Sequence, residues 1–131
     1  MPVAPLLYGA LPHTTLDAAM AVLQRFPMPY VVWPQLPQRS FRERSVVQAA
    51  CGFPGVVIDE QQRRVFVQRA VSAAGMPQLA LDFLQRRDAR AVMTPAEAAG
   101  LFAVLPFLQT QASHVGCKGQ LLGPISLAAQ L

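Results

Sequence analysis

The stretch Pro29-Tyr30-Val31-Val32-Trp33-Pro34 decides the fold class of this chain of 131 residues. Its centre is β-branched and aromatic, and a proline bounds it on each side. Such side chains pack well on a pleated surface, so the stretch predicts a short, buried strand. The segments before and after it carry helix signals. A buried strand between helices is typical of a parallel sheet in an α/β architecture.

Another strand and a helix are predicted on the N-terminal side of this stretch. The apolar run Leu6–Gly9 predicts a buried strand that ends in a tight turn at Gly9 and Pro12. Thr14 is the expected N-cap of the helix that follows, which Pro27 should stop. The apolar residues of this helix recur at near-helical spacing and are Leu16, Met20, Leu23 and Phe26.

On the C-terminal side, a helix and a hairpin are predicted. Ser40-Phe41-Arg42-Glu43 has the form of a capping box, so a helix should run over Phe41–Ala50. Val56–Ile58 and Val65–Val67 flank the polar stretch Asp59–Arg64. This pattern predicts a β-hairpin inserted into the main α/β frame.

Two helix starts are marked by proline. Pro77 suits the first turn of a helix that should run to about Arg87. Thr94-Pro95-Ala96-Glu97 is a further capping box, with Pro at the first helical position, where its missing N–H costs nothing. Within the helix that this box opens, Pro106 should either kink the helix or end it.

The last part of the chain predicts one more strand and one more helix. Val115–Leu122 has the apolar character of a third frame strand, and Gly123-Pro124 closes it. A new helix is expected to begin at Ser126. Together these patterns predict a single α/β segment over residues 1–131, with parallel strands joined by right-handed crossovers.

Composition excludes several classes of protein. Hydrophobic residues make up 53% of the chain and charged residues 14%, the opposite of the composition that keeps chains disordered. The longest apolar stretch, Ala98–Leu105, is far shorter than the roughly 18 residues of a membrane span. The N-terminus lacks the basic region of a secretory signal. We therefore expect a cytoplasmic protein that does not bind a membrane.

Cysteine and charge usage narrow the expected partners. Cys51 and Cys117 lie far apart in the sequence, which predicts free thiols rather than a disulfide scaffold. The formal net charge is +4. The arginines, however, alternate with acidic residues, and few aromatic residues lie among them to stack on bases. This mixture is typical of a solvated face, so no nucleic-acid binding is expected.

Segments of the chain resemble a known family. They are Gly9-Ala10-Leu11-Pro12-His13, then Trp33-Pro34-Gln35-Leu36-Pro37-Gln38-Arg39-Ser40, then Lys118-Gly119-Gln120-Leu121-Leu122-Gly123-Pro124-Ile125-Ser126. In order and spacing they are similar to successive strand ends of methionine-synthase-like proteins. That family belongs to the superfamily of cobalamin-independent methionine synthase and uroporphyrinogen decarboxylase.

The resemblance implies a fold and a function. The fold would be a partial (β/α)8 TIM-type barrel holding roughly the first three β/α units, with the hairpin as an insertion. The function would be that of the N-terminal segment of a methionine-synthase-like methyltransferase. In the methionine synthases of this superfamily, a zinc ion held by His, Cys and Glu residues late in the barrel activates a thiol. No residue of this chain matches those ligands, so the segment should be inactive alone.

In a barrel, the residues that follow each strand line the active-site mouth. The candidates of this kind for binding a small-molecule substrate are His13, Gln35, Arg39 and Ser126. Lys118 and Gln120 are further candidates, because they form the polar face of the predicted strand Val115–Leu122. The planar guanidinium of Arg39 suits a substrate carboxylate. Lys118 shares a strand face with Gln120. If that face is interior, its ammonium needs a carboxylate partner; otherwise it lies in water at a strand entrance.

Other functions stay open at this point. His13, Cys51, His114 and Cys117 form a nominal zinc-binding set, but the short paired spacings of a zinc finger are lacking, so no metal site is expected in this chain. The chain could instead be a non-catalytic α/β interaction module. It could also be part of a uroporphyrinogen decarboxylase-like enzyme, in which Arg39 would bind a substrate carboxylate without a metal.

An incomplete barrel has a physical consequence. A closed barrel has no edge, whereas a few strands leave unpaired N–H and C=O groups and an uncovered apolar face. The chain is therefore expected to form homo-oligomers or to bind the rest of a barrel.

Overall fold

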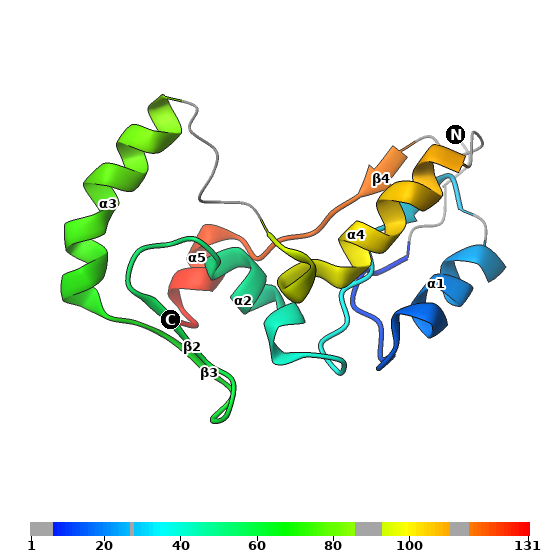
Figure 1. Cartoon of the computed structure of the whole chain (residues 1–131), viewed down its shortest axis with the longest axis horizontal. Helices are drawn as coiled ribbons and strands as arrows, with labels where there is room; N and C mark the ends of the chain where they lie inside the picture. The colour runs from blue at the N-terminus through cyan, green and yellow to red at the C-terminus, as the bar shows by residue number, and fades with distance from the viewer. Residues whose placement is uncertain (1–6, 27, 86–92, 111–115) are drawn as a thin grey trace.

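The computed structural model describes residues 7–26, 28–85, 93–110 and 116–131, and it is a mixture of helices and short strands (Figure 1). The α/β class predicted from the sequence is therefore confirmed. Helices α1 (Leu16–Arg25) and α4 (Pro95–Thr110) and strand β4 (Gly116–Lys118) lie at one end of the molecule, and helix α3 (Arg69–Leu84) lies at the other. Within the described ranges, no helix is both long enough and apolar enough to cross a bilayer.

The parallel pairing that the sequence predicts is present, but its strands are short. Strand β1 (Tyr30–Val32) pairs in parallel with β4 (Gly116–Lys118), so that Val31 lies opposite Cys117. Pro34 has no N–H to donate, and at Gln35 the chain pairs with another segment, in a parallel bridge to Ala10. There the backbone N–H of Gln35 donates to the Gly9 carbonyl at 2.8 Å.

The predicted outer strands need correction. Leu6 lies outside the described residues, and Leu7–Gly9 does not form a strand; its place is taken by a single parallel bridge between Ala10 and Gln35. In the predicted strand Val115–Leu122, the first residue lies outside the described part and the strand ends at Lys118. Beyond it, Gln120 does not continue the strand: its side chain accepts the N–H of Gly9, and its carbonyl accepts a hydrogen bond from the Gln35 side chain.

Two helices cover one face of β1 and form the apolar core. Helix α1 (Leu16–Arg25) and helix α4 (Pro95–Thr110) bring Leu23 and Val104 against Val31, all buried. The helical spacing in the sequence therefore predicted α1 correctly. Its N-cap, however, is Thr15 and not Thr14, because it is the Thr15 hydroxyl that accepts the N–H of Ala18 at 3.4 Å.

The capping box at Thr94 is confirmed, and the helix that it opens passes through Pro106. The Thr94 N–H donates to the Glu97 carboxylate at 3.0 Å, and the Thr94 hydroxyl accepts the N–H of Ala96 at 3.2 Å. Of the two alternatives for Pro106, an end of the helix is wrong, because α4 continues to Thr110; the break in helical backbone angles lies at Ala98, with φ −144° and ψ 50°. Directly after this break, Gly100 lets the helix approach Pro34 so closely that a Cβ would lie 1.9 Å from the Pro34 oxygen.

The capping box predicted over Ser40–Glu43 does not form. Ser40 caps only a short 3-10 helix, η1 (Phe41–Glu43), and helix α2 (Ser45–Ala50) begins after it. The Glu43 carboxylate does not return to the Ser40 N–H. It instead accepts the N–H of Leu36 at 3.0 Å, so it ties down the loop that leaves β1.

The hairpin is confirmed, and the helix after it starts earlier than predicted. Strands β2 (Val56–Asp59) and β3 (Arg64–Val67) pair in an antiparallel register. Helix α3 (Arg69–Leu84) begins directly after them, with Pro77 inside it and not in its first turn. The predicted end at Arg87 lies outside the described residues.

Helix α5 (Pro124–Ala128) ends the fold. It begins two residues before the predicted start at Ser126. Pro124 occupies the first turn, where its fixed φ suits a helix, and Gly123 is the N-cap.

Candidate functional site

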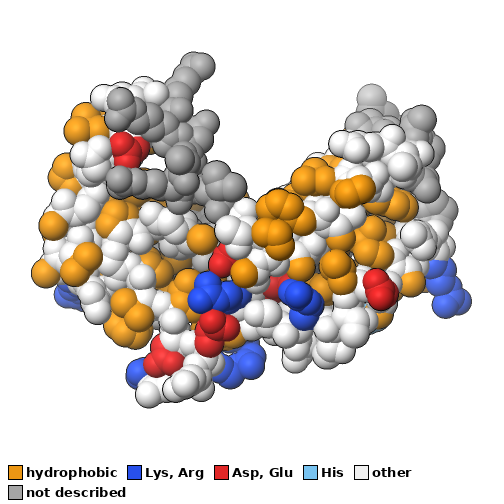
Figure 2. All heavy atoms as spheres, viewed as in Figure 1, with side chains coloured by type: hydrophobic (Ala, Val, Ile, Leu, Met, Phe, Trp, Pro, Cys, Tyr) orange, Lys and Arg blue, Asp and Glu red, His pale blue; other side chains and the backbone are white. Residues whose placement is uncertain are grey.

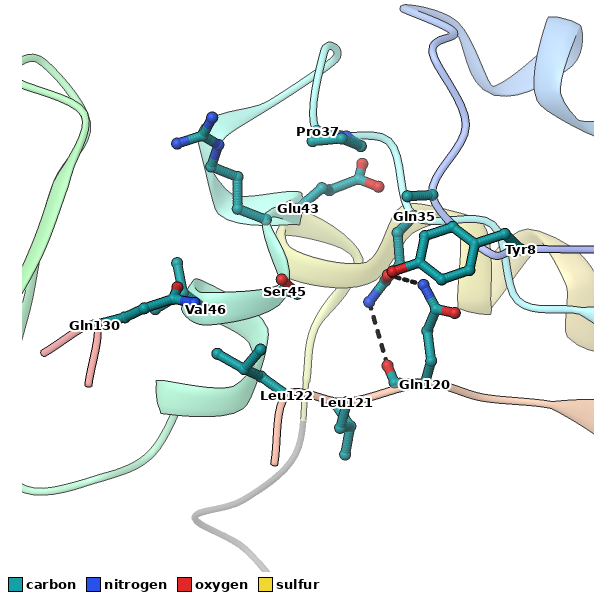
Figure 3. A pocket seen from close by; sticks show the side chains of 12 residues that line it. Tyr8, Gln35, Pro37, Glu43, Ser45, Val46, Gln120, Leu121, Leu122 and Gln130 are labelled. Carbon is teal, nitrogen blue, oxygen red and sulfur yellow. Dashed lines mark hydrogen bonds between the residues drawn. The ribbon is translucent and has the colours of Figure 1, made fainter. Parts of the chain in front are cut away.

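A cleft of about 440 Å³ opens beside the residues that follow β1 and β4 (Figure 3). Tyr8, Gln35 and Gln120 lie at one end of it, and Val46 and Gln130 lie at the other. Glu43 and Ser45 form part of the wall between them. The remaining residues that line the cleft are Ala10, Pro37, Arg44, Leu121 and Leu122.

Amide side chains connect the paired segments at the first end of the cleft. The Gln120 amide donates to Gln35 Oε1 at 2.8 Å, and the Gln35 amide donates to the Gln120 carbonyl at 3.3 Å. Gln120 Oε1 accepts the N–H of Gly9 at 3.3 Å. Gln35 is 2% exposed, so these bonds compensate for removing its amide from water.

Gln48 on α2 extends this network into the interior. Its Oε1 accepts a hydrogen bond from the Gln35 amide at 2.5 Å, and its own amide donates to the Glu97 carbonyl at 2.6 Å. Gln35 and Gln48 are both buried. The network therefore joins β1, α2 and α4, and it fixes the rotamer that Gln35 presents to the cleft.

Glu43 is a fully buried carboxylate in the wall of the cleft. One oxygen accepts the N–H of Leu36, and the other accepts a hydrogen bond from the Arg39 guanidinium. Both oxygens are therefore engaged by the protein, which is what a buried charge requires. The role of Glu43 is to hold the loop between β1 and η1 in place.

Glu97, on α4, is another buried carboxylate. Arg42 reaches it at 3.0 Å and also reaches Glu60 of the hairpin turn at 2.8 Å. Burial is the largest single influence on Glu97 and acts to raise its pKa. Hydrogen bonds from Thr94 and Arg42 outweigh it, so the pKa of Glu97 lies below its ordinary value.

Lys118 does not face a carboxylate in the described part of the chain. Its ammonium donates to the Leu7 carbonyl at 3.4 Å and lies 5.9 Å from the centroid of the Tyr8 ring. These contacts satisfy part of the ammonium and leave the side chain half-buried. Lys118 thus holds the N-terminal segment beside β4 and does not line the cleft.

The six candidate residues divide into two groups. Gln35 and Gln120 meet and line the cleft; Gln35 follows β1 as predicted, whereas Gln120 lies beyond the end of β4 and not inside the longer strand that the sequence predicted. His13, Arg39, Lys118 and Ser126 are not among the residues that line it. The guanidinium of Arg39 is occupied by Glu43, and Ser126 lies exposed on α5.

Tyr8, Glu43 and Gln48 are site residues that the sequence patterns missed. Tyr8 precedes Gly9 in the run that was interpreted as a buried strand, but it is 72% exposed beside the cleft. Glu43 was assigned to a capping box with Ser40, so its hydrogen bond with the Leu36 N–H was not expected. No local signal marks Gln48, because its partners lie 13 and 49 positions away.

The cleft offers hydrogen bonds and charge but no nucleophile paired with a base. Its lining residues include neither His nor Cys. Within the described residues, no group of at least three His, Cys, Asp or Glu side chains is placed to hold a metal ion. Cys51 and Cys117 are free thiols, and burial raises the pKa of each. The arrangement suits binding of a polar molecule.

Comparison with known proteins was negative: no protein-family model, no curated protein and no solved structure matches this chain.

Proposed function

We propose that this chain supplies part of the substrate-binding mouth of a methionine-synthase-like protein and binds a small polar molecule in the cleft beside the Gln35–Gln120 pair. On this proposal its parallel pairings belong to a (β/α)8-type barrel. The chemistry of methyl transfer, with its zinc ion, would require residues that this chain does not contribute. The chain alone would bind substrate and would not turn it over.

The observation that carries the proposal is the meeting of Gln35 and Gln120 in one cleft. Gln35 forms a parallel bridge with Ala10 beyond the end of β1, Gln120 lies two residues beyond the end of β4, and both come from stretches that resemble the family. In α/β barrels, ligands bind at this end of the strands. The second N–H of the Gln120 amide and the exposed Tyr8 hydroxyl give a ligand polar groups to bind at this end of the cleft.

A binding experiment tests the proposal. Trp33, the single tryptophan, lies in the segment between β1 and Gln35, so its fluorescence should respond to a ligand in the cleft. We expect one member of a panel of methionine, a folate and a porphyrin to bind, and Gln120→Ala to weaken that binding about ten-fold through loss of an amide hydrogen bond. Gln109→Ala, on the exposed side of α4, is the matched control and should bind as the unmodified chain does.

Absence of binding by every member of the panel would contradict the proposal. So would binding that is equally strong in the unmodified chain and in Gln120→Ala. A preference for the porphyrin over methionine and folate would favour a uroporphyrinogen decarboxylase-like function of the same cleft over methyl transfer.

We also propose that the chain associates with a second copy of itself. Helix α3 carries apolar side chains that the described fold leaves exposed, and Figure 2 shows hydrophobic side chains over this part of the surface. Within the described residues, β4 pairs on one side only. Sedimentation velocity at micromolar concentration should detect a dimer or larger species, and a monomer throughout would contradict this proposal.

A further inference from the structure

A second cleft, of about 510 Å³, lies between the η1–α2 segment and strand β3. Figure 2 shows basic and acidic side chains gathered over the hairpin and the neighbouring η1–α2 segment. Basic and apolar side chains line this cleft together. They are Phe41, Arg44, Val46, Arg63, Arg64, Val65 and Phe66, with Gln130 beyond the end of α5.

The nearby carboxylates are already taken by other arginines. Arg39 binds Glu43, and Arg42 binds both Glu60 and Glu97. Arg64 lies 3.9 Å from Asp59, at the outer limit of an ion pair, and is 61% exposed. The alternation of acidic and basic residues in the sequence therefore does not neutralise every arginine. Arginines without a carboxylate partner in the described chain remain next to η1.

These arginines are Arg44 and Arg63. In the described part of the chain, neither forms an ion pair. Each guanidinium lies 5.6 Å from the centroid of the same ring, that of the buried Phe41. The ring attracts both cations, but it brings two like charges to the wall of one cleft, where they repel each other.

The backbone at Arg63 adds to this observation. Its φ is +52°, and it is the non-glycine residue with positive φ in the described chain. A residue with a Cβ adopts this left-handed conformation at a cost, and glycine would adopt it freely. The hairpin turn therefore carries an arginine where the backbone favours glycine. A ligand for the guanidinium would explain why this position carries a charge.

We propose that this second cleft binds a phosphate monoester whose organic part is apolar or aromatic. The planar guanidinium forks of Arg44 and Arg63 match phosphate oxygens, and a dianion relieves their mutual repulsion. The volume of the cleft exceeds that of a phosphate group, and Phe66, Val46 and Val65 give the rest of the ligand an apolar wall. The site is separate from the Gln35–Gln120 end of the first cleft, although Arg44, Val46 and Gln130 line both clefts.

Calorimetric titration at constant ionic strength tests the site, with phenyl phosphate as the probe. Inorganic phosphate supplies the charge without the ring, and benzyl alcohol supplies the ring without the charge. Phenyl phosphate should bind at least about ten-fold more tightly than either, because only it uses both the arginines and the apolar wall. Equal binding of phenyl phosphate and inorganic phosphate would overturn the proposed organic part.

Two variants separate loss of the site from loss of the fold. Arg63→Gly removes the guanidinium and suits the positive φ, so it should weaken phenyl phosphate binding about ten-fold without lowering Tm. Arg44→Gln should weaken binding to a similar degree. Arg25→Gln is the matched control, since Arg25 also lies over a phenylalanine ring, at 5.8 Å from the Phe26 centroid, but lines neither cleft. No binding, or equal binding by all three variants, would overturn the proposal.

Discussion

The end of the molecule built around β1 and the end built around α3 both contain apolar side chains, but only the first end buries them. Around β1, the buried side chains include Val32, Leu36 and Val104. Along α3, the buried residue is Asp82, whereas Phe83 and Leu84 are more than three-quarters exposed. Apolar content alone therefore does not make a core. Helices α1 and α4 bury one face of β1, whereas the described chain covers α3 only in part, where Pro54 lies against Gly75.

Core substitutions should separate the two ends most strongly. Leu36 is fully buried, and Leu36→Ala should lower the free energy of unfolding by about 3 kcal/mol, because it removes buried methyl groups and leaves a cavity. Leu81 of α3 is 49% exposed, and Leu81→Ala should cost less than about 1 kcal/mol. Urea unfolding measures both. Equal losses would contradict the division of the molecule into a packed and an uncovered end.

The contact between α4 and β1 should be nearly as sensitive to a single added methyl group. Alanine normally stabilises a helix relative to glycine, but at Gly100 its Cβ would collide with the Pro34 backbone. We expect Gly100→Ala to destabilise the fold by about 2 to 3 kcal/mol. Gly123→Ala is the control, because nothing lies within 4 Å of its added Cβ. A higher Tm for Gly100→Ala would show that the two segments are not in contact.

Glu97 should contribute stability in a pH-dependent way. Its pKa in the folded chain lies below the ordinary value of 4.5, so its contribution is complete above that pH and is lost as the pH falls through the lowered pKa. Glu97→Gln should cost about 2 kcal/mol near neutral pH, through loss of charged hydrogen bonds. The difference from the unmodified chain should shrink in urea unfolding at about pH 3.

A matched carboxylate shows whether this effect is specific. Asp17 is exposed in the first turn of α1, and Asp17→Asn should cost less than about 1 kcal/mol, since it removes only a favourable interaction with the helix end. A constant difference between Glu97→Gln and the unmodified chain at both pH values would mean that the Glu97 charge does not stabilise the fold.

The smallest effect on stability, but a clear effect on assembly, is expected on α3. Phe83 is 80% exposed, so Phe83→Ser should change the free energy of unfolding by less than about 0.5 kcal/mol. If α3 is covered by a second copy, the same change should shift sedimentation toward the monomer. Ser126, exposed on α5, provides the control through Ser126→Ala. An unchanged distribution of species for Phe83→Ser would remove α3 from the proposed interface.

Much of the fold could be predicted from local sequence patterns, because β propensity and helix capping depend on residues that are close together in the sequence. β-Branched residues between prolines predicted β1, and the capping box at Thr94 predicted the start of α4. Helix α3 was misplaced because its N-cap, Gln68, forms no capping bond and Pro77 resembles a start signal. Alanines before Pro77 favour the helix, and Gly75 allows the Pro54 ring to lie where a side chain would be.

The candidate site was less predictable for the same reason. The place of Gln35 after a strand could be inferred from the pattern of elements, whereas Gln120 was expected inside a strand that in fact ends at Lys118. The partners of Glu43 and Gln48 could not be inferred, because a buried polar group takes whichever partner the packing brings to it. The two arginines on Phe41 were interpreted as a solvated face, since the sequence does not show which carboxylates are already bound.

Amide hydrogen exchange tests the central claim, that parallel pairing of distant segments holds the cleft residues together. The N–H groups of Leu11, Trp33 and Gln35 donate to carbonyls of Gln35, Lys118 and Gly9, respectively. They should exchange only through global unfolding. The N–H of Gln62, which binds Asp59 within the exposed hairpin turn, should exchange far faster. Exchange of Trp33 and Gln35 at the rate of Gln62 would contradict the account.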